Sequence, residues 1–597
     1  MRFILASIAL VLAVLLGGFG VAQRTILSGP DTLVAAVQSS SDAPVTVVSG
    51  ETLKSLDGRQ RLEIGGSPAI FAAYGRTTDV MAWIGDARHN TIAFDPETNA
   101  LTSTETGSEA TVPNPAGSDL WLLEYTGENV LDINVNLNTD LSFIIVSDGT
   151  APAPADISIA WPLDNRTPLA GPFMAAGGLM LVIALALLVW AFMHRRRTRG
   201  PRRKSIKGPK SQRMPRLPRQ RSYRVRRPAA LGAARGRRST TRMTAIIPVV
   251  LIGTLALSGC SADLWPEIGA DTTSASPTPS PSSSLAADPV EETLPPVATV
   301  RQVESIVADV SLVAETADAA LDAAALDARF MGPALALRTG NYETRAKDSA
   351  YPAPTAIPAG EIDVTLPEQA ETWPRVVLAV VSSPPDTSTD PATQAAPIAL
   401  TLLQQTPREQ YKVYYATTIT AAPPELAPAT VGAPRLDPDT KLLAMAPSQL
   451  AAAYVDVLNV GEASASYPLF DIPSDGLIPQ SGVAARETRT AALDAKAAIA
   501  FSITAGDAQT IALLSNAAGG LVSVYLNETE TVTPVETGAT INPEGATKTL
   551  SGITGTTKGV TATYGDQLLF YIPPIGSQDK IVLLGYTQGL LTAKEIE

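Results

Sequence analysis

The chain has 597 residues, a formal net charge of −13 and 45% apolar residues. A chain of this length is expected to form several domains. Its only cysteine is Cys260, which excludes an intrachain disulfide framework, so each domain must be held together by its own apolar core.

Two apolar stretches predict membrane segments. Residues 3–21 follow Arg2, so residues 1–24 are expected to be a signal anchor or a signal peptide cut after Ala22. Residues 171–193 contain no charged side chain and are long enough to cross a membrane as a helix. We therefore expect a transmembrane helix over residues 171–193.

Residues 28–165, between these stretches, are expected to form an extracytoplasmic all-β domain. Leu131, Ile133 and Val135 alternate with polar residues, which is typical of a strand with one face on a core. Further strands are expected at residues 69–74, 80–84, 120–125, 141–146 and 157–161. So many short strands favour a small β-sandwich or barrel.

A strongly basic segment, residues 194–243, follows the second apolar stretch. It contains 20 Lys and Arg residues and no acidic residue, so the positive-inside rule predicts that it is cytoplasmic and that its neighbours lie outside. We expect a disordered loop that contacts anionic lipid. Aromatic residues that could stack on bases are nearly absent, which argues against nucleic acid as a partner. The residues expected to set the topology are Arg195, Arg196, Arg197, Arg199, Arg202, Arg203 and Lys204.

The next apolar stretch, within residues 244–260, ends in a lipobox. Leu257, Ser258 and Gly259 precede Cys260, as in the processing signal of bacterial lipoproteins, where the cysteine becomes the lipid-bearing N-terminus. The apolar run is short for a spanning helix and suits a signal sequence. The alternative is a third transmembrane helix with a coincidental cysteine.

A tether rich in Ser, Thr and Pro is expected over residues 261–296. After it, Val303, Ile306, Val307 and Val310 recur at helical spacing and predict one or two helices within residues 300–339. Strands are then expected at residues 362–366, 376–381, 398–403 and 412–419.

The same order of elements repeats in the last part of the chain. Helices are expected at residues 447–458 and 484–499, followed by strands at 510–515, 521–526, 560–572 and 580–586. The pattern predicts two α+β units in tandem, residues 297–435 and 442–597, similar in element order to cystatin-like and NTF2-like folds. The expected fold is a multidomain membrane protein with a sandwich-like all-β outer domain, two to three membrane segments and an α+β C-terminal part.

Candidate catalytic and metal-binding residues are few. The two histidines, His89 and His194, both precede the C-terminal part, which excludes His-based triads and the usual zinc clusters there. His89 is expected in a turn. Asp437-Pro438-Asp439 fits a short metal-binding pattern, but a turn is the simpler interpretation. No spacing singles out a carboxylate pair, so we expect no catalytic residue, metal or cofactor.

The first 265 residues carry a resemblance. The residues concerned are Ala22-Gln23-Arg24-Thr25, Ser147-Asp148-Gly149-Thr150-Ala151-Pro152-Ala153-Pro154, Arg199-Gly200-Pro201-Arg202-Arg203 and Ser258-Gly259-Cys260-Ser261-Ala262-Asp263. In these the chain resembles uncharacterised actinobacterial cell-envelope proteins that combine a membrane-anchored β domain with a lipobox-bearing lipoprotein part. The resemblance implies a location and an organisation, and no activity.

These features together predict a non-catalytic membrane protein or lipoprotein of the cell envelope. We expect it in the cell membrane, with its major domains extracytoplasmic and in contact with membrane lipid. Those domains are expected to bind or scaffold an envelope component, either a protein or a wall polymer. The alternative is an envelope enzyme that acts on glycans, of the glycosyltransferase or hydrolase type.

Overall fold

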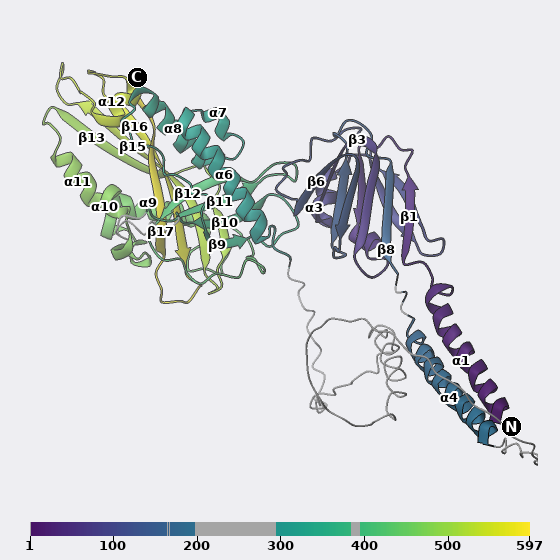
Figure 1. Ribbon diagram of the computed structural model, residues 1–597. Coiled ribbons are helices and arrows are strands. Elements are labelled where there is room, and N and C mark those ends of the chain that lie inside the picture. The colour runs from purple at the N-terminus through teal and green to yellow at the C-terminus, as the bar shows by residue number, and fades with distance from the viewer. Residues whose placement is uncertain (1, 164, 166, 198–293, 384–394) are drawn as a thin grey trace, which may run out of the picture. The chain divides into compact units, whose positions relative to one another are not determined.

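The computed structural model describes residues 2–163, 165, 167–197, 294–383 and 395–597 (Figure 1). Its contacts divide the chain into two compact units, one of residues 1–33 with 162–283 and one of residues 34–161 with 284–597. Most of the predicted basic loop, the lipobox with Cys260 and nearly all of the predicted tether lie outside the described residues.

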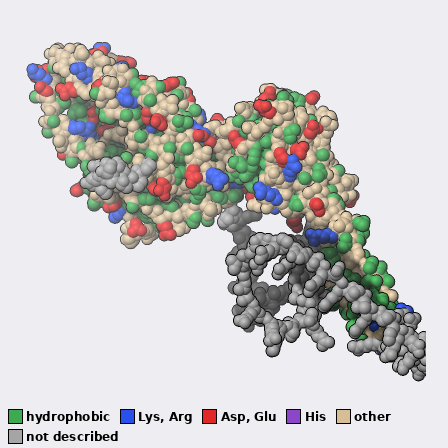
Figure 2. All heavy atoms as spheres, viewed as in Figure 1, with side chains coloured by type: hydrophobic (Ala, Val, Ile, Leu, Met, Phe, Trp, Pro, Cys, Tyr) green, Lys and Arg blue, Asp and Glu red, His purple; other side chains and the backbone are tan. Residues whose placement is uncertain are grey.

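Among its described residues, the first unit contains two helices, α1 (Arg2–Thr25) and α4 (Ala170–Arg197). Among the described residues, these are the two helices long and apolar enough to cross a membrane. They pack side by side, with Phe19 and Phe173 in ring contact at 5.3 Å between centroids (Figure 1). Apolar side chains are exposed along both helices, and Figure 2 shows them as green surface. The predicted spanning stretch is thus a helix, and Arg195, Arg196 and Arg197 lie at its C-terminal end.

The N-terminal part of the second unit is the β domain, residues 34–161. Its strands lie in one eight-stranded sheet, in the order β1-β8-β3-β7-β2-β4-β5 with β6 paired to β3. The first half of β3 pairs with β8 and the second half with β7, so the sheet branches at this long strand. Phe94 and Trp161, one on each branch, are in ring contact at 4.9 Å, so the branches pack against each other. The strands are β1 (Thr32–Gln38), β2 (Val45–Ser49), β3 (Gln60–Arg76), β4 (His89–Asp95), β5 (Ala100–Thr106), β6 (Leu123–Val135), β7 (Leu141–Val146) and β8 (Asp156–Pro162).

Two sequence-based expectations are wrong in this domain. Residues 80–84 were expected as a strand but belong to helix α3 (Thr77–Ile84), because Val80, Trp83 and Ile84 are buried at helical spacing and Asp79 stands in the first turn. His89 is no turn residue, since it begins β4 and is buried. Its Nε2 lies 3.0 Å from Thr106 Oγ1 on the neighbouring strand, which gives it a structural role.

The C-terminal part of the second unit, from residue 294, is the α+β domain. Its helices are α6 (Val300–Ala320), α7 (Ala323–Leu326), α8 (Gly332–Lys347), α9 (Pro447–Val460), α10 (Ile478–Ser481), α11 (Val483–Ala491) and α12 (Gly545–Ser551). Its strands are β9 (Ile362–Pro367), β10 (Arg375–Val381), β11 (Ile398–Gln404), β12 (Lys412–Ile419), β13 (Ala497–Ala505), β14 (Ile511–Leu514), β15 (Gly520–Pro534), β16 (Val560–Ile572) and β17 (Val582–Glu595). The helix expected over 484–499 ends at Ala491, and β13 begins at Ala497.

The two predicted α+β units share a single sheet. Its order is β13-β15-β16-β17-β12-β11-β10-β9, so the last strand of the chain joins the two halves. Alternate residues of β10 face different layers: Val377, Ala379 and Val381 pack with α6 and α8, whereas Val376, Leu378 and Val380 pack with strands of the second half. The second half has its own core under α9. The domain therefore has four layers: helices, the first half of the sheet, the second half of the sheet, and helices. Strands with two apolar faces need cover on both sides, so the two halves pack against each other and do not form separate units.

Candidate functional site

The join between the two half-sheets is a short one. Strands β12 and β17 pair only at Thr418 with Tyr586 and at Ile419 with Gly585. Beyond these pairs, side chains take over the hydrogen bonds: Gln567 Oε1 accepts from Ala416 N at 2.7 Å, and Thr587 Oγ1 accepts from Thr418 N at 3.1 Å. The strands therefore diverge, and a gap opens in the sheet.

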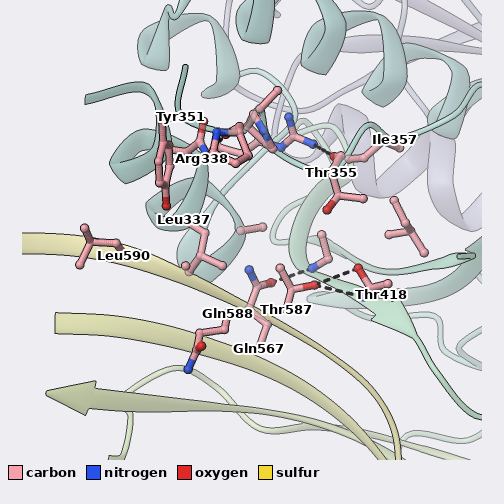
Figure 3. Close-up of a pocket in the computed structure, with 18 residues that line it drawn as sticks. Leu337, Arg338, Tyr351, Thr355, Ile357, Thr418, Gln567, Thr587, Gln588 and Leu590 are labelled. Carbon is pink, nitrogen blue, oxygen red and sulfur yellow. Dashed lines mark hydrogen bonds between the residues drawn. The ribbon is translucent and has the colours of Figure 1, made fainter. Parts of the chain in front are cut away.

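A pocket of about 230 Å³ lies at this gap, beneath α8 and the segment 351–357 (Figure 3). Ala334, Leu337 and Leu590 give it apolar walls, and Gln567, Thr587 and Thr418 give it hydroxyl and amide groups. It is slightly smaller than the usual range for ligand sites, which suits one small ligand or one ring of a larger one. No carboxylate, histidine or cysteine is among its described lining residues.

Arg338 is the charged residue of the lining, and its charge is already compensated. Its Nη1 donates to both carboxylate oxygens of Asp318 at 2.5 Å, and its Nη2 donates to the carbonyl oxygen of Thr355 at 2.8 Å. Tyr342 donates its hydroxyl to Asp318, and burial together with that carboxylate raises the pKa of Tyr342. Arg338 therefore holds the segment 351–357 over the pocket and is a positioning residue (Figure 3).

Asn341 lines the pocket, and its side chain carries a buried acceptor that has no partner among the described residues. Its Nδ2 donates to the carbonyl oxygen of Pro352 at 3.0 Å. Its Oδ1 is buried and has no hydrogen-bond partner among the described residues. Since a buried polar atom is costly without a partner, a ligand hydroxyl or N–H at this position would gain a favourable bond.

A pair of buried carboxylates, Glu528 and Asp566, lies on neighbouring strands β15 and β16. Glu528 accepts from Ser481 at 2.8 Å and from Gln588 at 3.0 Å, whereas neither oxygen of Asp566 has a hydrogen-bond partner among the described residues. Burial, and then the charge of Glu528, raise the pKa of Asp566 to about 7. The two side chains are 1% and 0% exposed and do not line the pocket, so a substrate would not reach them in this conformation.

The sites predicted from the sequence lie elsewhere. Arg199, Arg202, Arg203, Lys204 and the lipobox residues Leu257 to Cys260 fall outside the described residues. Asp437 and Asp439 form a turn, as expected, in which Asp437 Oδ1 accepts from Asp439 N at 2.8 Å. Within the described parts of the chain, no group of three or more His, Cys, Asp or Glu residues could hold a metal ion.

Sequence reasoning missed the residues of the pocket. Gln567 and Thr587 are polar residues within strands, and Arg338 is one arginine among many, so none carries a local signal. The divergence of β12 from β17 and the packing of α8 against these strands bring them together.

A family model, a domain of unknown function named DUF8094, matches residues 294–595, which is just over half of the chain. The chain belongs to the DUF8094 family. The matched residues are the α+β domain, so the pocket and the buried carboxylates both lie in the family domain. No curated protein and no solved structure is detectably similar to the chain.

Proposed function

We propose that this protein is a non-catalytic, membrane-anchored protein of the cell envelope, whose DUF8094 domain binds a small, uncharged, hydroxylated part of an envelope component. The observation that carries the proposal is the lining of the pocket. It has amide and hydroxyl groups and apolar walls, and the unpartnered acceptor of Asn341 lies buried beside it. Among the lining residues that the structure describes, Arg338 is the one cation, and it is paired with Asp318. Such a lining favours a sugar unit of a wall polymer over a charged ligand.

The proposed location is supported by the two apolar helices and by the arginines at the C-terminal end of α4. Under the positive-inside rule, Arg195, Arg196 and Arg197 hold the C-terminal end of α4 in the cytoplasm, where the basic loop contacts anionic lipid. The β domain and the DUF8094 domain are then extracytoplasmic, and a lipidated Cys260 gives the second domain its own anchor. Reporters fused near Ser28 and Asp288 should be extracytoplasmic and one near Gln212 cytoplasmic. An outside signal at Gln212 would overturn this topology.

An enzyme acting on glycans is the second candidate, and the Glu528–Asp566 pair favours it. A carboxylic acid with a pKa near 7 beside a second carboxylate is a common arrangement for acid–base cleavage of a glycosidic bond. The complete burial of both groups weighs against this candidate, because the scissile bond must reach them. Binding without turnover is therefore the function we propose.

Binding can be tested on the purified full-length protein in detergent. We expect neutral, soluble wall-polysaccharide fragments to give saturation-transfer NMR signals with the wild type. Asn341→Leu removes the free acceptor and should weaken binding at least about tenfold, the equivalent of one hydrogen bond to a buried group. Asn459→Leu is the matched control, since Asn459 also stands on a helix and bonds a backbone carbonyl, away from the pocket.

The same samples separate the two candidates. New reducing ends that appear with the wild type and not with Asp566→Asn would support the glycan enzyme and contradict a purely binding role. Equal binding by the wild type and by Asn341→Leu would contradict the proposal that the pocket is the binding site.

A further inference from the structure

A polar interface joins the β domain to the DUF8094 domain within the second compact unit. The β domain contributes Arg76, helix α3, Glu109 and the loop of residues 115–122. The DUF8094 domain contributes residues 296–302 and three arginines, Arg329, Arg375 and Arg408. The pocket is built from other residues, so this surface is a separate site.

Asp79 on α3 is the centre of the first contact. Arg375 Nη2 lies 2.8 Å from Asp79 Oδ1, and their side chains are 0% and 2% exposed. Arg76 also binds Asp79 at 2.8 Å and donates from Nη1 to the carbonyl oxygen of Pro296 at 2.9 Å. The guanidinium group of Arg375 lies over the ring of Trp373, at 3.6 Å from its centroid. The Arg375–Asp79 ion pair is thus fully desolvated, with Arg76 of the β domain and Trp373 of the DUF8094 domain packed around it.

Asp119 is the centre of the second contact. Arg329 Nη1 donates to Asp119 Oδ2 at 2.6 Å, and the backbone N–H of Tyr411 donates to the same oxygen at 2.7 Å. The carbonyl oxygen of Asp119 accepts from Gln302 Nε2 at 3.0 Å. Three separate segments of the DUF8094 domain therefore converge on this one residue, whose side chain is 5% exposed.

Arg408 makes the third contact, at the rim. Its Nε donates to the carbonyl oxygen of Trp83 at 2.8 Å, and its Nη2 donates to the carbonyl oxygen of Ile84 at 2.7 Å. The same Nη2 lies 3.6 Å from Glu109 Oε2. Trp373 packs against the apolar core that contains Trp83. Aromatic and arginine side chains are enriched at protein–protein interfaces, and both kinds stand at this one.

The three ion pairs found between described residues across the interface have the same polarity. The acids, Asp79, Asp119 and Glu109, stand on the β domain, and the arginines stand on the DUF8094 domain. A buried charge is strongly unfavourable without its partner, so each surface is complementary to the other and poorly suited to most alternatives. On the β domain, these contacts are made by residues between 76 and 119. On the other side, they are made by residues between 296 and 411, which all lie inside the matched family domain that begins at residue 294.

We infer that the protein partner of the DUF8094 domain is the β domain, and that the two remain bound as separate polypeptides when the chain between them is cut. Cleavage at Cys260 would produce two such polypeptides, a membrane protein and a lipoprotein. The inference depends on neither that cleavage nor the sugar-binding function, because the interface contains no residue of the pocket or of the lipobox.

The test uses the full chain with a protease recognition sequence inserted between Ser283 and Ser284. After cleavage in detergent, we expect the two fragments to elute together on size-exclusion chromatography. Arg408→Glu is the first variant, because this residue is partly exposed and its hydrogen bonds and ion pair described above all cross the interface. It should weaken association at least about tenfold, and Glu109→Arg in the same chain should restore part of the loss. Asp119→Ala should weaken it about 100-fold.

Arg61→Glu is the matched control, since Arg61 pairs with Asp132 inside the β domain and is 53% exposed. It should leave the complex intact. Circular dichroism of each fragment checks that the variants are folded. Wild-type fragments that are folded and separate after cleavage would overturn the inference. An effect of Arg408→Glu and Asp119→Ala no larger than that of Arg61→Glu would overturn it too.

Discussion

Gln567 on β16 reaches past β17 and accepts a hydrogen bond from the backbone N–H of Ala416 on β12, at 2.7 Å. The two strands are not neighbours in the sheet, so the side chain supplies a bond that a strand would otherwise supply. It closes the floor of the pocket and connects the two halves of the DUF8094 domain.

Replacing Gln567 by Leu should therefore destabilise the protein. The N–H of Ala416 would lose its acceptor, and an unsatisfied buried group costs about 1–3 kcal/mol in the free energy of unfolding. Chemical denaturation followed by circular dichroism would measure the loss. Gln480→Leu is the control, because Gln480 is exposed, and it should change stability by less than about 0.5 kcal/mol.

Asp566 should make stability depend on pH. Its folded-state pKa of about 7 lies above the unfolded value, so the folded state retains a proton that the unfolded state has lost. The stabilisation is complete below about pH 4 and disappears as the pH rises to about 7, a difference of roughly 4 kcal/mol. Asp566→Asn should remove this slope and stabilise the protein at pH 8. Asp132→Asn, at an exposed ion pair, should retain it. A wild type equally stable at pH 4.5 and pH 8 would contradict the prediction.

The packing of helices α1 and α4 should depend on a close approach of two glycines. A Cβ atom added to Gly177 on α4 would lie 2.5 Å from the backbone nitrogen of Gly17 on α1, whereas one added to Gly178 would meet nothing within 4 Å. Glycine at such a contact lets two helix backbones approach. Gly177→Leu should therefore abolish disulfide crosslinking between cysteines placed at Phe19 and Phe173 in a Cys260→Ala background, and Gly178→Leu should not.

The same contact predicts that α1 is retained as a signal anchor. If residues 1–22 were removed as a signal peptide, the glycine face of α4 would lose the helix against which it packs. Mass spectrometry of the purified protein should thus find the N-terminal residues in place. An N-terminus at Gln23 would contradict this.

Cys260 should carry lipid in the mature protein. Each buried CH₂ contributes about 0.8 kcal/mol, so two or three acyl chains on one residue suffice to hold a domain at a membrane. The wild type should yield a lipid-labelled fragment of residues 260–597, and Cys260→Ala should run as the uncut, unlabelled chain. A full-length wild type with a free thiol would instead favour a third transmembrane helix.

Much of the secondary structure was determined by the sequence on its own. Strands β7, β12 and β16 were predicted to the residue or nearly so, because each is a strongly apolar or alternating run with turn residues at its ends. Helix α6 was predicted from the spacing of Val303, Ile306 and Val310, which all face one core. Helix α4 was predicted from the length and hydropathy of residues 171–193, since a long uncharged run has few alternatives to a helix.

Tertiary structure decided the rest. The pattern at residues 80–84 suits either a strand or a helix, and burial of Val80, Trp83 and Ile84 against the β-domain core selected the helix α3. That choice places Asp79 opposite Arg375, a residue 296 positions away. The single sheet, the pocket beneath α8 and the interface all depend on such pairings over long sequence distances. Local periodicity reports which face of an element is apolar, whereas the partner that covers this face is set by the packing of the whole chain.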